Sequence, residues 1–205
     1  MRRRGETRLT DKRFKASEAH RLDAPERLVW LPPLEVVRAL HLRGGETVAD
    51  IGAGTGYFSL PIIRAVGTSG KVFAVDAQRE MLAHLREKMQ RESAAGIEPV
   101  HAEADATTLP DSSCDVVFLA NVWHEFADRM AVLRESLRIL RRPGRVAILD
   151  WRPDVEREAG PPLEHRIAGA VAVAELNAAG FTQIEQHNVG KYSWLVQGRT
   201  AVAHG

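Results

Sequence analysis

One stretch of closely spaced glycines, 47–60, constrains this chain more than any other part of the sequence. It reads TVADIGAGTGYFSL, with an apolar run first and glycines at every second position after it. The apolar run is typical of a buried strand, and the spacing after Tyr57 is that of a helix. Strand, glycine turn and helix in this order form the first half of a βαβ unit. Glycines let the main chain touch a ligand, so the pattern predicts a nucleotide-like ligand here.

Strands and helices alternate along the rest of the chain. Apolar runs predict strands at 71–75, 97–102, 115–120 and 145–150, and helical spacing predicts helices at 24–42, 78–92, 129–140 and 168–179. An Arg-Pro-Gly sequence at 142–144 predicts a turn. The last two predicted strands, 181–187 and 192–197, are joined by too few residues for a parallel crossover. We therefore expect an α/β fold with a mostly parallel sheet and one antiparallel strand near its end.

Composition narrows the class of protein. The chain has 205 residues, a formal net charge of +1 and one cysteine, Cys114. We expect a flexible charged arm over 1–22 and a single domain over 23–205. The balanced charge argues against a nucleic-acid partner, and no apolar run is long enough to span a membrane. No signal peptide is visible, so we expect a cytoplasmic protein without a disulfide framework.

Polar residues follow the predicted strands, where open α/β sheets bind their ligands. Asp76 can accept hydrogen bonds from both hydroxyls of a ribose, or it can cap the helix that follows. His124 comes directly after a central strand and has the proton affinity of a general base, but it can equally begin the next helix. No cysteine or second histidine at helical spacing accompanies His124, so we expect no metal site.

Residues after the fifth predicted strand are candidates for an acceptor pocket. Asp150 and Trp151 end that strand, and the loop that follows contains Pro161, Pro162 and His165. If the last strand is antiparallel, the end of one final strand, His187-Asn188, and the start of the other, Lys191-Tyr192, open on the same face. This partly aromatic and weakly charged group suits a small organic molecule. Ordinary packing is the alternative for each of these residues.

The glycine stretch resembles the first motif of the class I methyltransferases that use S-adenosylmethionine. That motif, D-x-G-x-G-x-G, is matched by Asp50 and the three glycines that follow it. A dinucleotide fingerprint would instead place its third glycine at position 57. The segment VDAQREML at 75–82 and the Ala-Asp-Ala segment at 104–106 also match, although alanine replaces the usual glycine at 104. Over 24–150 the chain is most similar to the small bacterial ubiquinone/menaquinone C-methyltransferase-like (type 11) group.

This resemblance implies a three-layer, Rossmann-like fold with seven strands and methyl transfer from S-adenosylmethionine to a small-molecule acceptor. Within it, Asp76 binds the ribose, Asp105 the adenine amino group, and His124 is the candidate catalytic base. The implied cofactor-binding residues are Asp50, Gly52, Gly54, Gly56, Asp76, Ala77, Asp105, Ala106 and Asn121. The glycines admit the methionine portion of the cofactor. A homodimer is left open.

Two other function classes stay open at this point. One is a protein that binds S-adenosylmethionine without catalysis, because the cofactor motifs are clearer than any catalytic residue. The other is a nicotinamide-dependent oxidoreductase on a similar sheet, against which Tyr57 argues.

Overall fold

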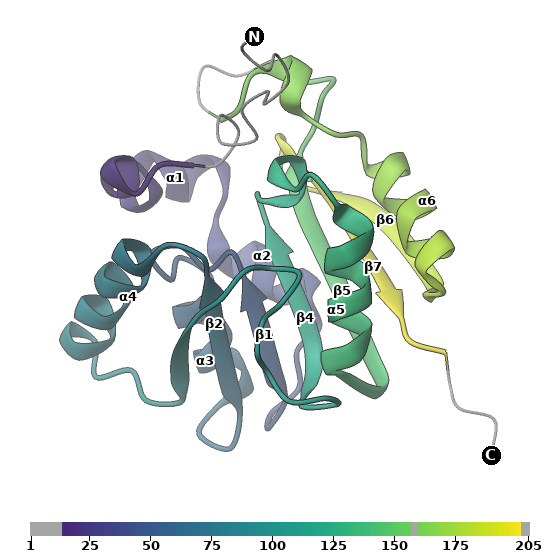
Figure 1. Cartoon of the computed structure of the whole chain (residues 1–205). Helices are drawn as coiled ribbons and strands as arrows, with labels where there is room; N and C mark the ends of the chain where they lie inside the picture. Colours follow the sequence, from purple (N-terminus) through teal and green to yellow (C-terminus); the bar gives the residue numbers. More distant parts are fainter. Residues whose placement is uncertain (1–13, 157–159, 202–205) are drawn as a thin grey trace, which may run out of the picture.

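A seven-stranded sheet between two layers of helices forms the body of the molecule (Figure 1). The structure is a computed structural model that describes residues 14–156 and 160–201. The strands are β1 (Thr47–Ile51), β2 (Lys71–Asp76), β3 (Ile97–His101), β4 (Cys114–Ala120), β5 (Leu140–Trp151), β6 (Thr182–Val189) and β7 (Ser193–Arg199). They are ordered β3-β2-β1-β4-β5-β7-β6. Strands β1 to β5 pair in parallel, and β7 is antiparallel to both of its neighbours, which confirms the expected fold.

Helices cover both faces of this sheet. The helical segments are η2 (Ala16–Asp23), α1 (Pro25–Trp30), α2 (Pro33–Ala39), α3 (Ser59–Val66), α4 (Arg79–Arg91), η3 (Trp123–Glu125), α5 (Arg129–Ile139), η4 (Leu163–His165) and α6 (Gly169–Ala179). Helices α2, α3 and α4 share one core with the sheet, and α5 and α6 share the other. None of the helices in the described part of the chain is long and apolar enough to cross a membrane.

The central strands are buried on both faces because their side chains alternate between the two cores. In β4, Val116 and Phe118 belong to one core, and Val117 and Leu119 belong to the other. All four side chains are fully buried. This double burial explains why the strand is a continuous apolar run rather than an alternating one.

The sheet reverses its winding direction between β1 and β4. Strand β1 pairs with β2 on one side and with β4 on the other. Connections therefore leave the carboxyl ends of these two strands in opposite directions and open a crevice between them, where ligands of doubly wound sheets bind. Segment η2–α1 and the segment after β5 both lie over this end of the sheet (Figure 1).

The N-terminal region differs from the expected flexible arm. Residues 1–13 lie outside the described residues, but 14–22 pack over the carboxyl ends of the strands. The backbone N–H of Phe14 donates to Glu125 Oε1, and that of Ala16 donates to Gln78 Oε1, both at 3.1 Å. The Gln78 side chain donates in return to the Phe14 carbonyl at 2.8 Å. These contacts with distant segments, which no local pattern reveals, hold 14–22 in place.

Two other boundaries differ from the sequence predictions. The helix expected over 24–42 is divided into α1 and α2, because Pro32 and Pro33 interrupt it. The turn expected at 142–144 is a bulge within β5, since Cys114 pairs with Leu140 but Val116 pairs with Arg145. Thr200 fixes this bulge: its N–H donates to the Gly144 carbonyl, and its Oγ1 accepts from the Gly144 N–H, both at 2.9 Å.

Candidate active site

A cavity of about 440 Å³ lies at the carboxyl ends of β1, β2 and β4. Seven of the ten residues that the sequence predicts for the site line this cavity: Asp50, Gly52, Gly54, Asp76, Ala77, Asn121 and His124. The other three, Gly56, Asp105 and Ala106, are not part of its lining. The structure thus brings most of the predicted residues to one place.

The glycine turn adopts a backbone that other residues rarely take. Gly52, Gly54 and Gly56 have φ values of +75°, +55° and +81°. A Cβ atom on Gly52 would lie 2.6 Å from the Val122 side chain, and one on Gly54 would lie 3.2 Å from Leu22. The main chain at these two positions is therefore pressed between the cavity and its neighbours.

Gly56 serves packing rather than the cavity. A Cβ atom there would lie only 2.3 Å from Leu85 Cδ1 on α4. The glycine lets α4 pack closely against the turn, and it is not part of the cavity lining.

Asp76 connects the glycine turn to the start of α4. Its Oδ2 accepts a hydrogen bond from the Gly54 N–H, and its Oδ1 accepts one from the Gln78 N–H, both at 2.8 Å. The side chain lines the cavity and is 9 % exposed. Both roles expected for this carboxylate are thus compatible: it bonds the backbone where α4 begins, and it faces the cavity.

Asp50 is buried in the cavity wall, at 2 % exposure. Burial raises the pKa of its carboxyl to about 7, and the nearby charge of Asp76 adds to this shift. A hydrogen bond from Ser59 Oγ, at 2.6 Å, opposes it. Asp50 is therefore a buried acid whose pKa lies close to neutral pH.

The segment after β3 is displaced by one or two residues from its expected position. Asp105 and Ala106 are exposed, whereas Ala102, Glu103 and Ala104 line the cavity. Thr107 fixes this segment from the other side, because its backbone N–H donates to the buried Glu135 carboxylate at 2.8 Å. The acid that matches the family motif is thus not part of the cavity lining, and the acid that lines it, Glu103, precedes the motif.

His124 and Asp150 form a buried pair at the ends of β4 and β5. The His124 Nδ1 atom lies 2.9 Å from both Asp150 carboxylate oxygens, and the His124 backbone N–H donates to Oδ2 at 2.9 Å. The Trp151 N–H also donates to this carboxylate, at 2.7 Å. Asp150 is fully buried, and His124 is 6 % exposed and lines the cavity. Asp150 therefore fixes the orientation of the imidazole ring.

Asn121 lines the same region in a strained conformation. Its φ is +57°, and its backbone N–H donates to the Leu149 carbonyl at 2.8 Å. The side-chain Oδ1 is buried and has no hydrogen-bond partner among the described residues. Backbone strain and a buried unsatisfied acceptor at one residue both point to a ligand contact.

Residues of the N-terminal region complete the cavity, and sequence reasoning missed them. Six of them line it: Phe14, Glu18, Arg21, Leu22, Arg27 and Trp30. Trp30 of α1 packs on Trp151 with 4.9 Å between ring centroids. Of the residues expected at the acceptor pocket, Trp151, Pro161, Pro162 and His165 line the cavity, whereas Asp150, His187, Asn188, Lys191 and Tyr192 are not part of its lining. The sequence offers no motif in 14–30 that would have singled out these residues.

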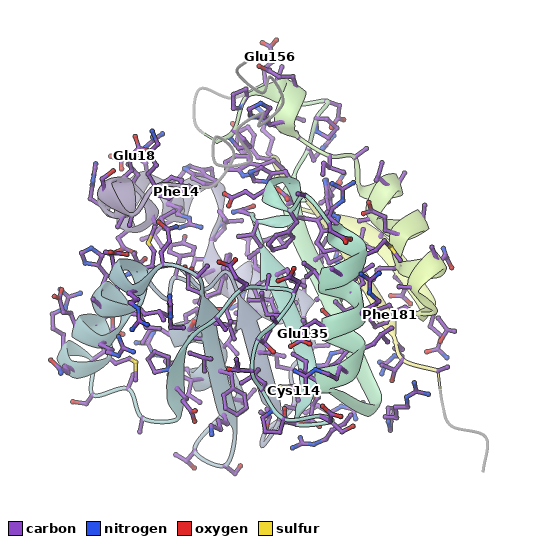
Figure 2. The ribbon with its side chains drawn as sticks, in the orientation of Figure 1. Phe14, Glu18, Cys114, Glu135, Glu156 and Phe181 are labelled. Atoms are coloured by element: carbon purple, nitrogen blue, oxygen red, sulfur yellow. The ribbon has the colours of Figure 1, made fainter. Side chains whose placement is uncertain are left out.

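The lone cysteine lies at the other end of the sheet. Cys114 begins β4, whereas Ala120 at the end of the same strand lines the cavity. Figure 2 shows it in the lower half of the molecule, far from Phe14 and Glu18. Within the described ranges, no group of three histidine, cysteine or acidic side chains is placed to hold a metal ion.

Comparisons with known proteins agree with this geometry. A family model described as "Methyltransferase domain" matches residues 49–148. The ubiquinone/menaquinone biosynthesis C-methyltransferase UbiE of Escherichia coli is 33% identical over 117 residues, which are 56% of this chain and 47% of that protein. The chain thus spans about half the length of the curated relatives it matches.

Solved structures extend the similarity over most of the chain. A SAM dependent methyltransferase from Aquifex aeolicus is 32% identical with a TM-score of 0.87, and the match covers 92% of this chain and 100% of that one. A putative type 11 methyltransferase from Sulfolobus solfataricus shares the fold at 23% identity, with a TM-score of 0.63 and coverage of 89% and 95%.

The cavity also fits the cofactor of this family. The carboxylate of Asp76 at the end of β2 suits the hydroxyls of a ribose. The glycines that line the cavity let a ligand come close to the main chain. The buried Asn121 Oδ1, which has no partner among the described residues, suits a polar atom of the ligand. The protein belongs to the class I S-adenosylmethionine-dependent methyltransferases, a family whose cofactor is S-adenosylmethionine.

Proposed function

We propose that this protein transfers a methyl group from S-adenosylmethionine to a small organic acceptor, with His124 as the general base. The observation that carries the proposal is the buried His124–Asp150 pair, which lines the same cavity as the glycine turn and Asp76. A pocket that only bound the cofactor would not need a histidine oriented by a buried carboxylate.

Cofactor binding is assigned to the residues around the glycine turn. Asp76 accepts the ribose hydroxyls, while Asp50, Gly52, Gly54 and Ala77 shape the wall beside it. Asn121 Oδ1 accepts a hydrogen bond from the methionine portion. The lining residues 102–104 take the place expected of Asp105 and Ala106 beside the adenine, because those two residues are exposed.

His124 acts on the acceptor. The contact with Asp150 assigns the proton of the neutral ring to Nδ1, which leaves Nε2 as the basic nitrogen. Nε2 would take the proton that the acceptor atom loses as its new bond to the methyl carbon forms and the carbon–sulfur bond breaks, with the electron pair of the broken bond staying on sulfur. Asp150 would stabilise the resulting imidazolium. When bound, S-adenosylmethionine supplies a methyl group made electrophilic by the sulfonium. A base of this kind contributes about 10²–10⁴-fold in rate.

The far side of the cavity suits a flat, mostly apolar acceptor. Trp30, Phe126 and Trp151 line it together with two prolines of the loop after β5. Aromatic and proline surfaces favour a small organic molecule over a phosphate backbone.

The cytoplasmic location and the lack of a nucleic-acid partner remain predictions of the sequence.

Calorimetry with S-adenosylmethionine tests the cofactor assignment. We expect the wild type to bind and Asp76→Ala to lose about 100-fold or more in affinity, since two charge-assisted hydrogen bonds to the ribose are lost. The matched control is Asp105→Ala, an exposed carboxylate outside the lining, which should bind within about threefold of the wild type. A wild type that does not bind would discard the assignment.

Turnover tests the catalytic assignment. The protein is incubated with S-adenosylmethionine carrying a deuterated methyl group and with panels of phenols, amines, thiols and carboxylic acids, and labelled products are detected by mass spectrometry. A labelled product supports methyl transfer. Persistent binding without any labelled product would favour the non-catalytic alternative.

A further inference from the structure

Arg27 is a buried cation in the cavity wall that protein atoms satisfy only in part. Its side chain is 7 % exposed, and one nitrogen, Nη1, donates to the Leu22 carbonyl at 2.8 Å. The guanidinium carbon lies 4.0 Å from the centroid of the Tyr57 ring. Its Nε is buried and has no hydrogen-bond partner among the described residues. A buried donor without an acceptor is costly, so a native site that contains one needs an explanation.

Another equally buried arginine shows what full satisfaction looks like. Arg166 is 8 % exposed, and its guanidinium donates to the carbonyls of Pro161, Arg152 and Val155. It does not line the cavity. The two arginines thus differ in that the one facing the cavity has a buried Nε without an acceptor among the described residues.

The other cavity arginine is already neutralised. Arg21 forms an ion pair with Glu18 at 3.0 Å and is exposed. The carboxylate whose charge acts on Arg27 is that of Asp23. It already forms an ion pair with Lys88 and accepts a hydrogen bond from Thr55 Oγ1. Burial lowers the pKa of Arg27 to about 10, which still leaves it charged at neutral pH. The cavity wall therefore holds a cation whose counter-ion the described protein residues do not supply.

The position of Arg27 indicates which ligand group it meets. Asp76 and the lining residues 102–104 lie at the ends of β2 and β3. The guanidinium carbon of Arg27 instead lies 6.0 Å from the centroid of the Trp30 ring. Trp30 in turn packs on Trp151 at the end of β5. A ligand that places its ribose at Asp76 therefore has its other end directed toward Arg27. The end of S-adenosylmethionine farthest from adenine is an amino acid, and its carboxylate is the only anionic group of the cofactor.

We infer that Arg27 binds the methionine carboxylate of the cofactor through its unsatisfied guanidinium edge. This inference rests on the proposed function. A guanidinium fork matches a carboxylate in shape and charge, and the hydrogen bonds are charge-assisted. The buried Asn121 Oδ1 is an acceptor in the same cavity and suits the ammonium group of the same amino acid.

The test compares two ligands that differ only in the carboxylate. S-adenosylhomocysteine has it, and S-adenosyl-3-thiopropylamine, the decarboxylated analogue, lacks it. By calorimetry, we expect the wild type to prefer S-adenosylhomocysteine by about 10- to 100-fold, the effect of one charge-assisted contact. Arg27→Gln should lose this preference by binding S-adenosylhomocysteine more weakly, with affinity for the analogue within about threefold of the wild type. Arg27→Lys should recover part of the preference.

Arg134→Gln is the matched control: this arginine is exposed on α5 and does not line the cavity, so the variant should leave both affinities unchanged. Thermal unfolding of each variant shows whether it is folded, and the wild-type comparison of ligands stands without any variant. Equal wild-type affinity for the two ligands would overturn the role of Arg27, and so would an equal loss of both ligands in Arg27→Gln. Unchanged binding of S-adenosylhomocysteine in Arg27→Gln would also overturn it. A wild type that binds neither ligand would instead overturn the proposed function.

Discussion

The two walls of the cavity are built in different ways. The glycine wall consists of 50–55 and 76–78, and the far wall consists of Arg27, Trp30, His124, Trp151, 160–162 and His165. In the glycine wall, backbone N–H groups of Gly54 and Gln78 bond directly to Asp76. In the far wall, side chains from distant segments meet, such as Trp30 on Trp151.

This difference separates two tasks. Main-chain atoms on adjacent strands vary little with side-chain identity, so the glycine wall suits a constant ligand such as the cofactor. The far wall is made of side chains from separate segments, and each of these can be substituted without altering the others. Such a wall suits an acceptor and a catalytic group that differ from one family member to another. Arg27 is the proposed exception, because it lies in the far wall and reaches the cofactor.

Replacing His124 should produce the largest effect and should affect turnover alone. His124→Asn keeps a side-chain donor toward Asp150 but removes the base, so we expect kcat to fall by about 10²–10⁴-fold. The affinity for S-adenosylhomocysteine should stay within about threefold, since the far-wall base does not hold the cofactor. Steady-state kinetics and calorimetry measure the two quantities, and His84→Asn on the exposed side of α4 is the control. An equal loss of kcat and cofactor affinity would break the separation of the walls.

The pH dependence of stability tests the burial of Asp50 in the glycine wall. Its folded pKa of about 7 is above its ordinary value of 3.8, so between these values the folded state keeps a proton that the unfolded state releases. The contribution of Asp50 to the free energy of unfolding therefore falls as pH rises from about 4 to 7, with a slope of up to about 1.4 kcal/mol per pH unit. Asp50→Asn should lose this slope in urea unfolding series at several pH values. The same slope in both proteins would contradict the buried, protonated carboxyl.

Two neighbouring glycines sharpen the comparison at a smaller scale. Gly56→Ala introduces a methyl group against Leu85 at a positive φ and should lower the free energy of unfolding by about 1–3 kcal/mol. Cofactor affinity should change by less than about threefold, because Gly56 does not line the cavity. Gly54→Ala, which alters the lining itself, should weaken S-adenosylhomocysteine binding more than Gly56→Ala does. Denaturant unfolding and calorimetry on both variants decide this, and the reverse order of affinities would refute the assignment of Gly56 to packing.

Much of the site was predictable where sequence neighbours are also spatial neighbours. Asp50, Gly52, Gly54 and Asp76 lie on the ends of adjacent parallel strands, so strand order alone brings them together. Asp105 shows the limit, since a displacement of one or two residues in a loop turns a side chain from the cavity to solvent. The packing of 14–22 and the role of Gly56 depend on contacts with Gln78, Glu125 and Leu85, which the local sequence does not contain.

The sequence by itself determined the mostly parallel sheet, its antiparallel strand and the glycine wall proposed to bind the cofactor, because continuous apolar runs, short links and glycine spacing encode backbone geometry directly. Only the tertiary structure decided that Asp150 orients His124, that 14–22 cover the cavity and that Arg27 is buried without a counter-ion among the described residues. These features arise where segments far apart in the chain meet. Burial and hydrogen-bond satisfaction at such meetings depend on the whole packing and not on any local pattern.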